Sequence, residues 1–307
     1  MKTGLVWKVL KWILAGACVI WVISLLTGSI PKPEAVWSAV LQIPWYWHFA
    51  ALLSATANWW LEALKWQLLV SNLENLSLGN AAKGLFAGAA ANNVIPFRVG
   101  EFLGRVMYLK EENRPAALLN NYFGATCQTL VTLIVGIPAA YALLGNEAEK
   151  YGRSSVYYIL PFLLLLGIAW IVVKSRNKKP AWLEKWLMGF RHFSGRQILG
   201  TLGLSFFRYL VFGGFYAFFI INFQLADFST ALTGVACIFF IQTFTPGMIY
   251  TDAAVRLSLP LLIFSISEPQ KPLLLGIAVI NYFYNVLLPA LIGIIVFILH
   301  RWKPHSS

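Results

Sequence analysis

The sequence predicts an all-α polytopic membrane protein with about six transmembrane helices and two proline-broken re-entrant helical hairpins in an inverted repeat. The first observation is composition: 59% of the 307 residues are hydrophobic and only 12% are charged, with a mean hydropathy of +0.68. A soluble domain usually has about 25% charged residues. The other two observations are long apolar runs between basic loops and an internal sequence repeat. Together they exclude a disordered protein, a coiled coil and an ordinary soluble enzyme.

Six apolar runs are expected to form transmembrane helices, since a helical span takes roughly 20 residues. They lie at about 12–26, 46–70, 116–144, 156–173, 198–222 and 272–299. The first run follows Lys2, Lys8 and Lys11, which would also suit a cleavable signal peptide. No small-x-small cleavage site leads into a soluble domain, so we expect an uncleaved first helix.

Two further stretches, 80–110 and 230–265, are each interrupted by a proline, Pro96 and Pro246. Proline removes a backbone donor and clashes with the preceding helical turn, so each stretch should break into two short helices. Such halves are too short to span the bilayer singly. We therefore expect broken or re-entrant hairpins, which are tolerated at membrane depth where they pack in protein or line a wet cavity.

The basic residues predict the orientation in the membrane. With the N-terminus inside and six helices crossing, 18 Lys and Arg residues fall inside, Lys65 among them, and four fall outside. Arg208 and Arg256 remain at membrane depth. The positive-inside rule then places both termini in the cytoplasm, in the inner (cytoplasmic) cell membrane. This bias also accounts for the net charge of +12, so no nucleic-acid partner is expected.

The polar loop 174–197 has one apolar face, formed by Trp182, Leu183, Trp186, Leu187 and Phe190 and flanked by basic residues. It is either an interfacial amphipathic helix on the anionic inner leaflet or a plain linker. We divide the single membrane domain 1–307 into a first helix and loop (1–45), repeat one (46–144), a connecting helix and amphipathic cytoplasmic loop (145–197), repeat two (198–299) and a cytoplasmic tail (300–307). Three scattered cysteines and four scattered histidines predict no disulfide, metal site or cofactor.

An internal repeat appears when the sequence is shifted by 150 residues. The shift aligns Asn58 with Arg208, Gly84 with Gly234, Asn92 with Gln242 and Pro96 with Pro246, and one further residue aligns Glu101 with Asp252 and Arg105 with Arg256. Three membrane passages separate the two units, so their orientations are opposite. Inverted repeats with broken helices near the midplane are typical of alternating-access carriers.

Charged residues at membrane depth are costly and usually mark function or a buried pair. The candidate binding residues are Asn92, Arg98, Glu101, Arg105, Gln242, Asp252, Arg256, Glu62 and Arg208, and the hairpin breaks are assigned to Pro96, Gly100, Pro246 and Gly247. In one interpretation the hairpin arginines bind an anionic headgroup, because the arginine fork suits phosphate. In the other, each i, i+4 acid–arginine pair only neutralises itself and locks its hairpin.

The flanking helices offer two counter-charges. We expect Glu62 to pair with the arginines of the first hairpin and Arg208 to pair with Asp252. Asn92 and Gln242 lie one turn before the prolines, where they either cap freed backbone groups or touch a ligand.

The pattern Asn92-x-x-x-Pro96-x-Arg98-x-Gly100-Glu101-x-x-x-Arg105, followed by a second Pro-Gly hairpin, resembles the flippase-like membrane domain of lysylphosphatidylglycerol synthases. The resemblance covers roughly 40–300. The second hairpin departs from the family pattern, which is usually Pro-Gly-Gly-x-Gly followed by Glu. This sequence keeps only Pro246-Gly247, and it has Tyr250 near the expected glycine and Asp252 in place of the glutamate. The resemblance implies movement of a phospholipid or isoprenoid-phosphate lipid between leaflets, without the synthases' soluble aminoacyl-transferase domain.

The leading hypothesis is therefore a lipid translocator that is not an enzyme, with membrane lipids as partners and a homo-oligomer or a lipid-modifying enzyme as a further partner. A small-solute or ion carrier using the same repeats is the main alternative. An integral membrane enzyme acting on lipid-linked substrates is a third hypothesis, and a non-transporting partner of another membrane protein is a fourth. No nucleotide-binding loop pattern is found.

Overall fold

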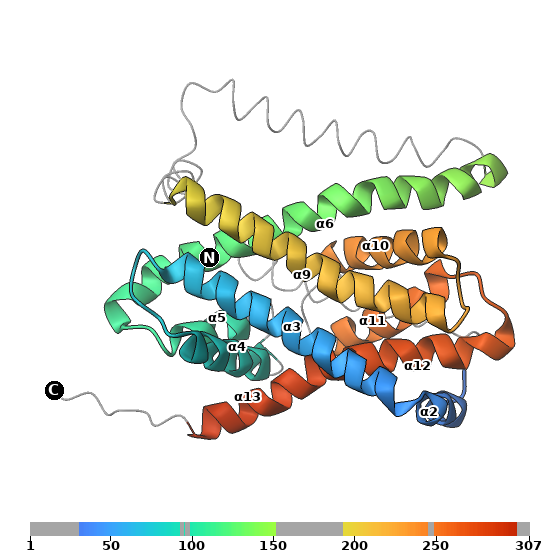
Figure 1. The fold of residues 1–307 in the computed structure, drawn as a ribbon, viewed down its shortest axis with the longest axis horizontal. Helices are drawn as coiled ribbons and strands as arrows, with labels where there is room; N and C mark the ends of the chain where they lie inside the picture. The colour runs from blue at the N-terminus through green and yellow to red at the C-terminus, as the bar shows by residue number, and fades with distance from the viewer. Residues whose placement is uncertain (1–30, 93–94, 96–98, 152–192, 245–248, 300–307) are drawn as a thin grey trace, which may run out of the picture.

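The computed structural model describes residues 31–92, 95, 99–151, 193–244 and 249–299 (Figure 1). All regular structure in these ranges is helical, which confirms the all-α prediction. The predicted first helix, the apolar run 156–173 and residues 174–192 of the amphipathic loop lie outside the described residues, as do Pro96, Arg98, Pro246 and Gly247. The end of the loop, predicted at residue 197, is wrong, because α9 already begins at Gly195.

Two long helices form the centre of the molecule: α3 (Trp45–Val70) and α9 (Gly195–Asn222). They pack against each other in antiparallel directions (Figure 1). Near one end, Trp47 stacks on Phe219 with ring centroids 4.7 Å apart. Near the other, the Gln197 side chain donates to the Leu68 carbonyl over 3.3 Å. Gln197 also closes a capping box with Ser194, which fixes where α9 begins.

Each central helix is followed by two shorter helices that pack against each other, and we call each such pair a hairpin. The first hairpin consists of α4 (Leu78–Asn92) and α5 (Val99–Val106), and the second of α10 (Phe228–Phe244) and α11 (Ile249–Ile263). The helices α3, α4 and α5 begin 150 residues before α9, α10 and α11, respectively. The same offset in the sequence and in the helix boundaries is what a duplicated unit would produce.

The first hairpin is held together by direct contact between its two backbones. A β-carbon on Gly104 would lie 2.0 Å from the backbone nitrogen of Gly88, and one on Gly100 would lie 2.3 Å from the carbonyl carbon of Ala91. Small residues four apart allow such close helix packing in membranes. Gly100, expected at the hairpin break, instead lies inside α5, where the close approach to α4 requires a glycine.

The second hairpin has side chains between its helices instead. Phe264 and Ile263 fill the space in front of Gly234. At the start of α10, the Asp227 carboxylate accepts from the Thr230 hydroxyl over 2.6 Å and from the Thr230 N–H over 3.0 Å. These hydrogen bonds hold the pKa of Asp227 below its ordinary value.

A third segment completes each half. In the first half this is α6 (Arg114–Tyr151), preceded by η1 (Glu111–Asn113). In the second it is α12 (Lys271–Tyr282), the π-helical turn η3 (Phe283–Leu287) and α13 (Leu288–Leu299), preceded by η2 (Glu268–Gln270). These segments exchange partners: α13 packs against α4 of the first hairpin, and α6 packs against α10 of the second (Figure 1). The short helix α2 (Pro33–Gln42) packs on α12.

Hydrophobic packing divides the described residues into two cores. One surrounds the C-terminal part of α3, including Trp66 and Leu69, and the other surrounds the C-terminal part of α9, including Tyr216 and Phe219. Because the two helices are antiparallel, the cores lie toward opposite ends of the pair. The middle of the α3–α9 contact lies between them.

Among the described residues, three helical segments are long and apolar enough to cross a membrane: Glu111–Leu143, Gly195–Asn222 and Glu268–Leu299. They match three of the six predicted spans. The second predicted run, 46–70, forms the 26-residue helix α3, which contains the buried polar residues Asn58, Glu62 and Lys65. The outer surface is rich in exposed large apolar side chains, such as Ile134, Ile295 and Ile298. The protein is therefore a helical membrane protein.

Candidate functional site

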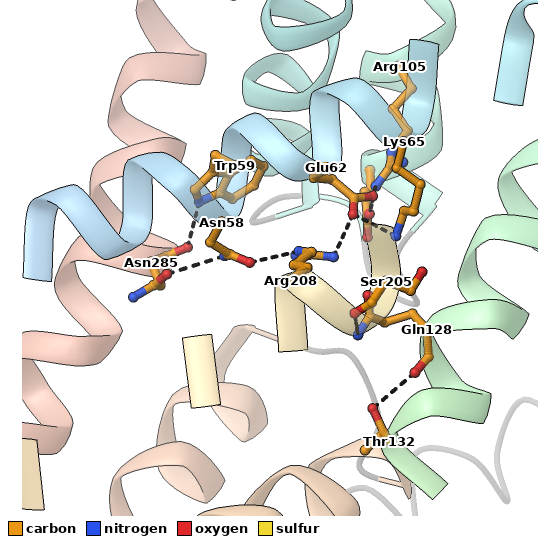
Figure 2. A network of polar contacts seen from close by, with 11 residues as sticks. Asn58, Trp59, Glu62, Lys65, Arg105, Gln128, Thr132, Ser205, Arg208 and Asn285 are labelled. Carbon is orange, nitrogen blue, oxygen red and sulfur yellow. Dashed lines mark hydrogen bonds and ion pairs between the residues drawn. The ribbon is translucent and has the colours of Figure 1, made fainter. Parts of the chain in front are cut away.

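A buried carboxylate, Glu62, is the centre of a cluster of charged side chains in the middle of the α3–α9 contact (Figure 2). Only 3% of its side chain is exposed. One oxygen, Oε1, accepts from Nη2 of Arg105 over 2.8 Å. The other, Oε2, lies 2.7 Å from Nζ of Lys65 and accepts from Nη1 of Arg208 over 2.6 Å. Glu62 thus joins three cations from the separate helices α3, α5 and α9.

Arg105 connects this cluster to the first hairpin. Its guanidinium also pairs with Glu101, one turn earlier on α5, and its central carbon lies 5.5 Å from the centre of the Trp66 ring. The buried Nε of Arg105 has no hydrogen-bond partner among the described residues. The predicted pairing of Glu62 with a hairpin arginine is therefore present, and one guanidinium donor remains for another acceptor.

Arg208 connects the cluster to the second half of the chain. Its Nε donates to Oδ1 of Asn58 over 2.8 Å, and the Asn58 amide donates in turn to Oδ1 of Asn285 over 3.3 Å (Figure 2). Asn58 and Arg208 are the residues that the 150-residue shift aligns. Two aligned residues can touch in this way only where the two units cross, so they mark the centre of the antiparallel pair.

The prediction that Arg208 pairs with Asp252 is wrong. Arg208 is held at the α3 crossing by Glu62 and Asn58, whereas Asp252 accepts from Nε of Arg256 over 2.7 Å, one turn further along α11. About one-fifth of each side chain of the pair on α11 is exposed, so this pair is less buried than Glu62. The structure therefore brings Glu62, Glu101, Arg105 and Arg208 together, and leaves Asp252 and Arg256 as a separate pair.

The two predicted amides lie near the ends of their hairpin helices. Asn92 is the last residue of α4, and its buried Oδ1 has no hydrogen-bond partner among the described residues. Gln242 lies half-buried near the end of α10. Whether these amides cap the backbone or touch a ligand stays a prediction.

Sequence reasoning missed Lys65, which it counted among the cytoplasmic basic residues. The structure buries this side chain to 3% exposure, three residues after Glu62 on the same face of α3. The i, i+3 spacing of two opposite charges in an apolar helix was the available signal. It also missed Asn285 and the indole of Trp59, which donates to the Asn285 carbonyl over 3.2 Å.

That last contact has a local cause. Pro289 has no N–H, so it cannot donate to the Asn285 carbonyl four residues earlier as a residue of a regular α-helix would. The Trp59 indole N–H donates to this carbonyl from α3. The contact ties the π-helical turn η3 to the same central helix as the charged cluster.

The charges of the cluster do not cancel. Lys65, Arg105 and Arg208 are cations, and Glu62 and Glu101 are the only carboxylates paired with them in the described part of the chain. Burying unbalanced charge is costly unless a further group compensates it. Glu101 and Arg208 keep 38% and 26% of their side chains exposed, so the cluster is accessible on that side. The arrangement is suited to an anion.

No group of three or more potential metal ligands occurs among the residues described here. The fold and the site define a helical membrane protein with a buried, cation-rich cluster between two similar halves. The chain belongs to the family described as the lysylphosphatidylglycerol synthase TM region, whose model matches residues 9–266. This confirms the resemblance seen in the sequence. No curated protein and no solved structure matches the chain.

Proposed function

We propose that the protein translocates an anionic lipid, a phospholipid or an isoprenoid-phosphate lipid, between the two leaflets of the inner cell membrane. The observation that supports this most is the surplus of cations around Glu62, buried at the crossing of two similar, antiparallel halves. A phosphate diester could accept hydrogen bonds from Arg208 and from the free Nε of Arg105. The apolar outer surface would leave the acyl chains in the bilayer.

The proposed mechanism is alternating access. In this proposal the chain has about six spans, both hairpins are re-entrant, and the termini face the cytoplasm. The two halves form an inverted repeat, as in carriers whose sites lie near the midplane. The exchange of α6 and α13 between the hairpins would let one half rock against the other around the α3–α9 crossing. We propose transport without catalysis, with the lipid as the partner.

Membership of the family supports a lipid rather than a small solute, since the family name refers to a lipid-modifying protein. A free anion would need the same donors, however, so the test compares the two. Purified protein in liposomes would be assayed for leaflet exchange of fluorescent phosphatidylglycerol and for uptake of inorganic phosphate. We expect protein-dependent lipid exchange and no phosphate uptake.

The site assignment is tested in the same vesicles. Arg208→Gln removes a donor that reaches Glu62 from α9, and exchange should fall about tenfold, the equivalent of one charge-assisted hydrogen bond. Arg114→Gln is the matched control, because Arg114 keeps 41% of its side chain exposed and pairs loosely with Glu111 over 3.6 Å. Equal exchange by both variants would overturn the site. Exchange that does not require protein would overturn the function.

A further inference from the structure

Two side-chain hydroxyls on α9 are completely buried, those of Thr201 and Ser205, one helical turn apart. Neither hydroxyl has a hydrogen-bond partner among the described residues. Burying a hydroxyl without a hydrogen bond is costly, so buried hydroxyls in proteins are normally satisfied. These two are therefore open to a group from outside the described part of the chain.

The usual way to satisfy a hydroxyl inside a helix is a hydrogen bond to the carbonyl four residues earlier. Other threonines of this protein form that bond over 2.8–3.0 Å: Thr56, Thr126, Thr132 and Thr243. Thr201 and Ser205 do not form it, although they are more deeply buried than any of the four. Their hydroxyls differ in this respect from those elsewhere in the described helices.

The register of the two central helices places these hydroxyls at the charged cluster. At one point of the contact, Gln197 of α9 donates to the Leu68 carbonyl of α3. Further along, Arg208 donates to Asn58. The two hydroxyls lie between these points and on the same face of α9, since residues four apart share a helix face. They therefore lie opposite the turn of α3 that contains Glu62.

A third open polar atom comes from α6. The Gln128 amide donates to the Ser205 carbonyl over 3.5 Å, and its buried side-chain oxygen has no hydrogen-bond partner among the residues described. One turn earlier on α6, a β-carbon on Gly124 would lie 4.0 Å from Cε of Lys65. Gln128 thus lies beside the same part of the cluster, below Lys65 in the view of Figure 2.

These three open atoms differ from the cations of the cluster in what they can bind. The amide oxygen only accepts hydrogen bonds, and each hydroxyl both donates and accepts. A phosphate diester has no donor, so it cannot satisfy the amide oxygen. Neighbouring alcohol groups can satisfy all three atoms, because each of them also donates and accepts. An ammonium group would instead lie next to Lys65, which has the same charge.

We propose that Thr201, Ser205 and Gln128 form a subsite for headgroup hydroxyls, so that the protein selects anionic lipids whose phosphate carries a polyol, either glycerol or a sugar. The inference rests on the proposed function: the cations bind the phosphate, and the subsite binds the group attached to it. The three atoms are buried in this conformation, so the headgroup reaches them when the two halves move apart at the α3–α9 crossing.

The test compares anionic lipids that differ in headgroup hydroxyls, in the vesicles of the exchange assay. Acyl-labelled phosphatidylglycerol and phosphatidylinositol carry hydroxyls. Phosphatidylpropanol has the same phosphodiester charge and the three-carbon chain of glycerol without them. At least one hydroxylated lipid should exchange about fivefold to tenfold faster than phosphatidylpropanol, which corresponds to about one net hydrogen bond. A preference for phosphatidylglycerol assigns the subsite to glycerol, and a preference for phosphatidylinositol assigns it to a ring of sugar size.

Two variants connect this preference to the subsite. Ser205→Ala and Thr201→Val each remove one hydroxyl with little change in side-chain shape, so the ratio of the two exchange rates should fall toward one. Thr126→Val is the matched control, because the Thr126 hydroxyl already donates to the Tyr122 carbonyl over 2.9 Å. It should keep the wild-type ratio. A ratio measured within one variant does not depend on how much folded protein the vesicles contain.

The outcomes separate the two proposals. Equal exchange of the hydroxylated lipids and phosphatidylpropanol by the wild-type protein would mean that the three atoms only hold water, which overturns the subsite and leaves translocation in place. A wild-type ratio that persists in both variants assigns the preference to other residues and also overturns the subsite. If none of these lipids exchanges in a protein-dependent way, the proposed function is overturned and the subsite with it. The lipid comparison in the wild-type protein stands even where a variant does not fold.

Discussion

Where α3 places Glu62 and Lys65 at the crossing, α9 has Phe212 and Phe215 at the positions 150 residues later. Phe212 stacks on Phe239 of the second hairpin with ring centroids 4.9 Å apart. The first half thus forms ion pairs between its central helix and its hairpin, whereas the second half forms aromatic contacts in the same place.

The hairpins differ in the same sense. Backbone meets backbone through Gly88 and Gly104 in the first hairpin, while the position aligned with Gly104 in the second is Val255. Arg105 consequently reaches across to Glu62, but its counterpart Arg256 stays with Asp252 on its own helix. Two halves with the same order of helices therefore differ in their side chains. The first half provides most of the charged residues of the site, and the second half provides Arg208 and a packed apolar core.

The largest effect is expected from Glu62→Gln, which leaves Lys65, Arg105 and Arg208 without the buried carboxylate that they share. Removing one partner of a buried ion pair typically costs about 3–5 kcal/mol. The free energy of unfolding, measured by denaturant titration in detergent micelles, should fall by that amount. Glu268→Gln, at an exposed pair on η2, should change it little. Equal stability of the two variants would contradict a central role for Glu62.

A smaller effect is expected from Gly104→Ala, because the new methyl group would meet the backbone of Gly88 at 2.0 Å. Overpacking of this kind usually costs about 1–3 kcal/mol, and the displaced α5 should also weaken the Arg105–Glu62 contact. Gly203→Ala on α9 is the control, since nothing lies within 4 Å of its new methyl group. The free energy of unfolding, measured in detergent micelles, should be lower for Gly104→Ala than for Gly203→Ala. The same decrease in both variants would mean that the first hairpin is not closely packed.

Trp59→Phe should cost about 1 kcal/mol, the usual net value of one hydrogen bond. It removes the indole donor to the Asn285 carbonyl and keeps an aromatic ring at the position where the Trp59 ring packs on Phe86, with centroids 5.5 Å apart. Amide hydrogen exchange should increase selectively around η3. No change in exchange there would show that the Asn285 carbonyl does not depend on Trp59.

The smallest effect is expected from the double variant Asp252→Asn, Arg256→Gln. This pair is partly exposed and lies within one helix, where such pairs contribute roughly 0.2–1 kcal/mol. Its stability should therefore stay within about 1 kcal/mol of the wild-type value. A loss as large as that of Glu62→Gln would remove the distinction between the two halves.

Much of this organisation could be predicted from the sequence, because it depends on local signals. Separate helices lie on either side of Pro96 and of Pro246, as expected for these prolines, and the 150-residue offset of the helices agrees with the aligned residues. The partner of Arg208 could not be predicted, because it depends on which faces α3 and α9 present where they cross. The burial of Lys65 was missed for a related reason: a basic residue near the end of an apolar run is equally typical of a cytoplasmic boundary.

Headgroup selectivity tests the central claim most directly. In vesicles that contain the protein, the leaflet exchange of fluorescent phosphatidylglycerol is compared with that of phosphatidylcholine, in the wild-type protein and in Arg208→Gln. A buried surplus of cations predicts that the anionic lipid exchanges at least about tenfold faster, a difference of about 1.4 kcal/mol, and that the ratio falls toward one in the variant. Equal rates for the two lipids, or a ratio unchanged by Arg208→Gln, would contradict the account.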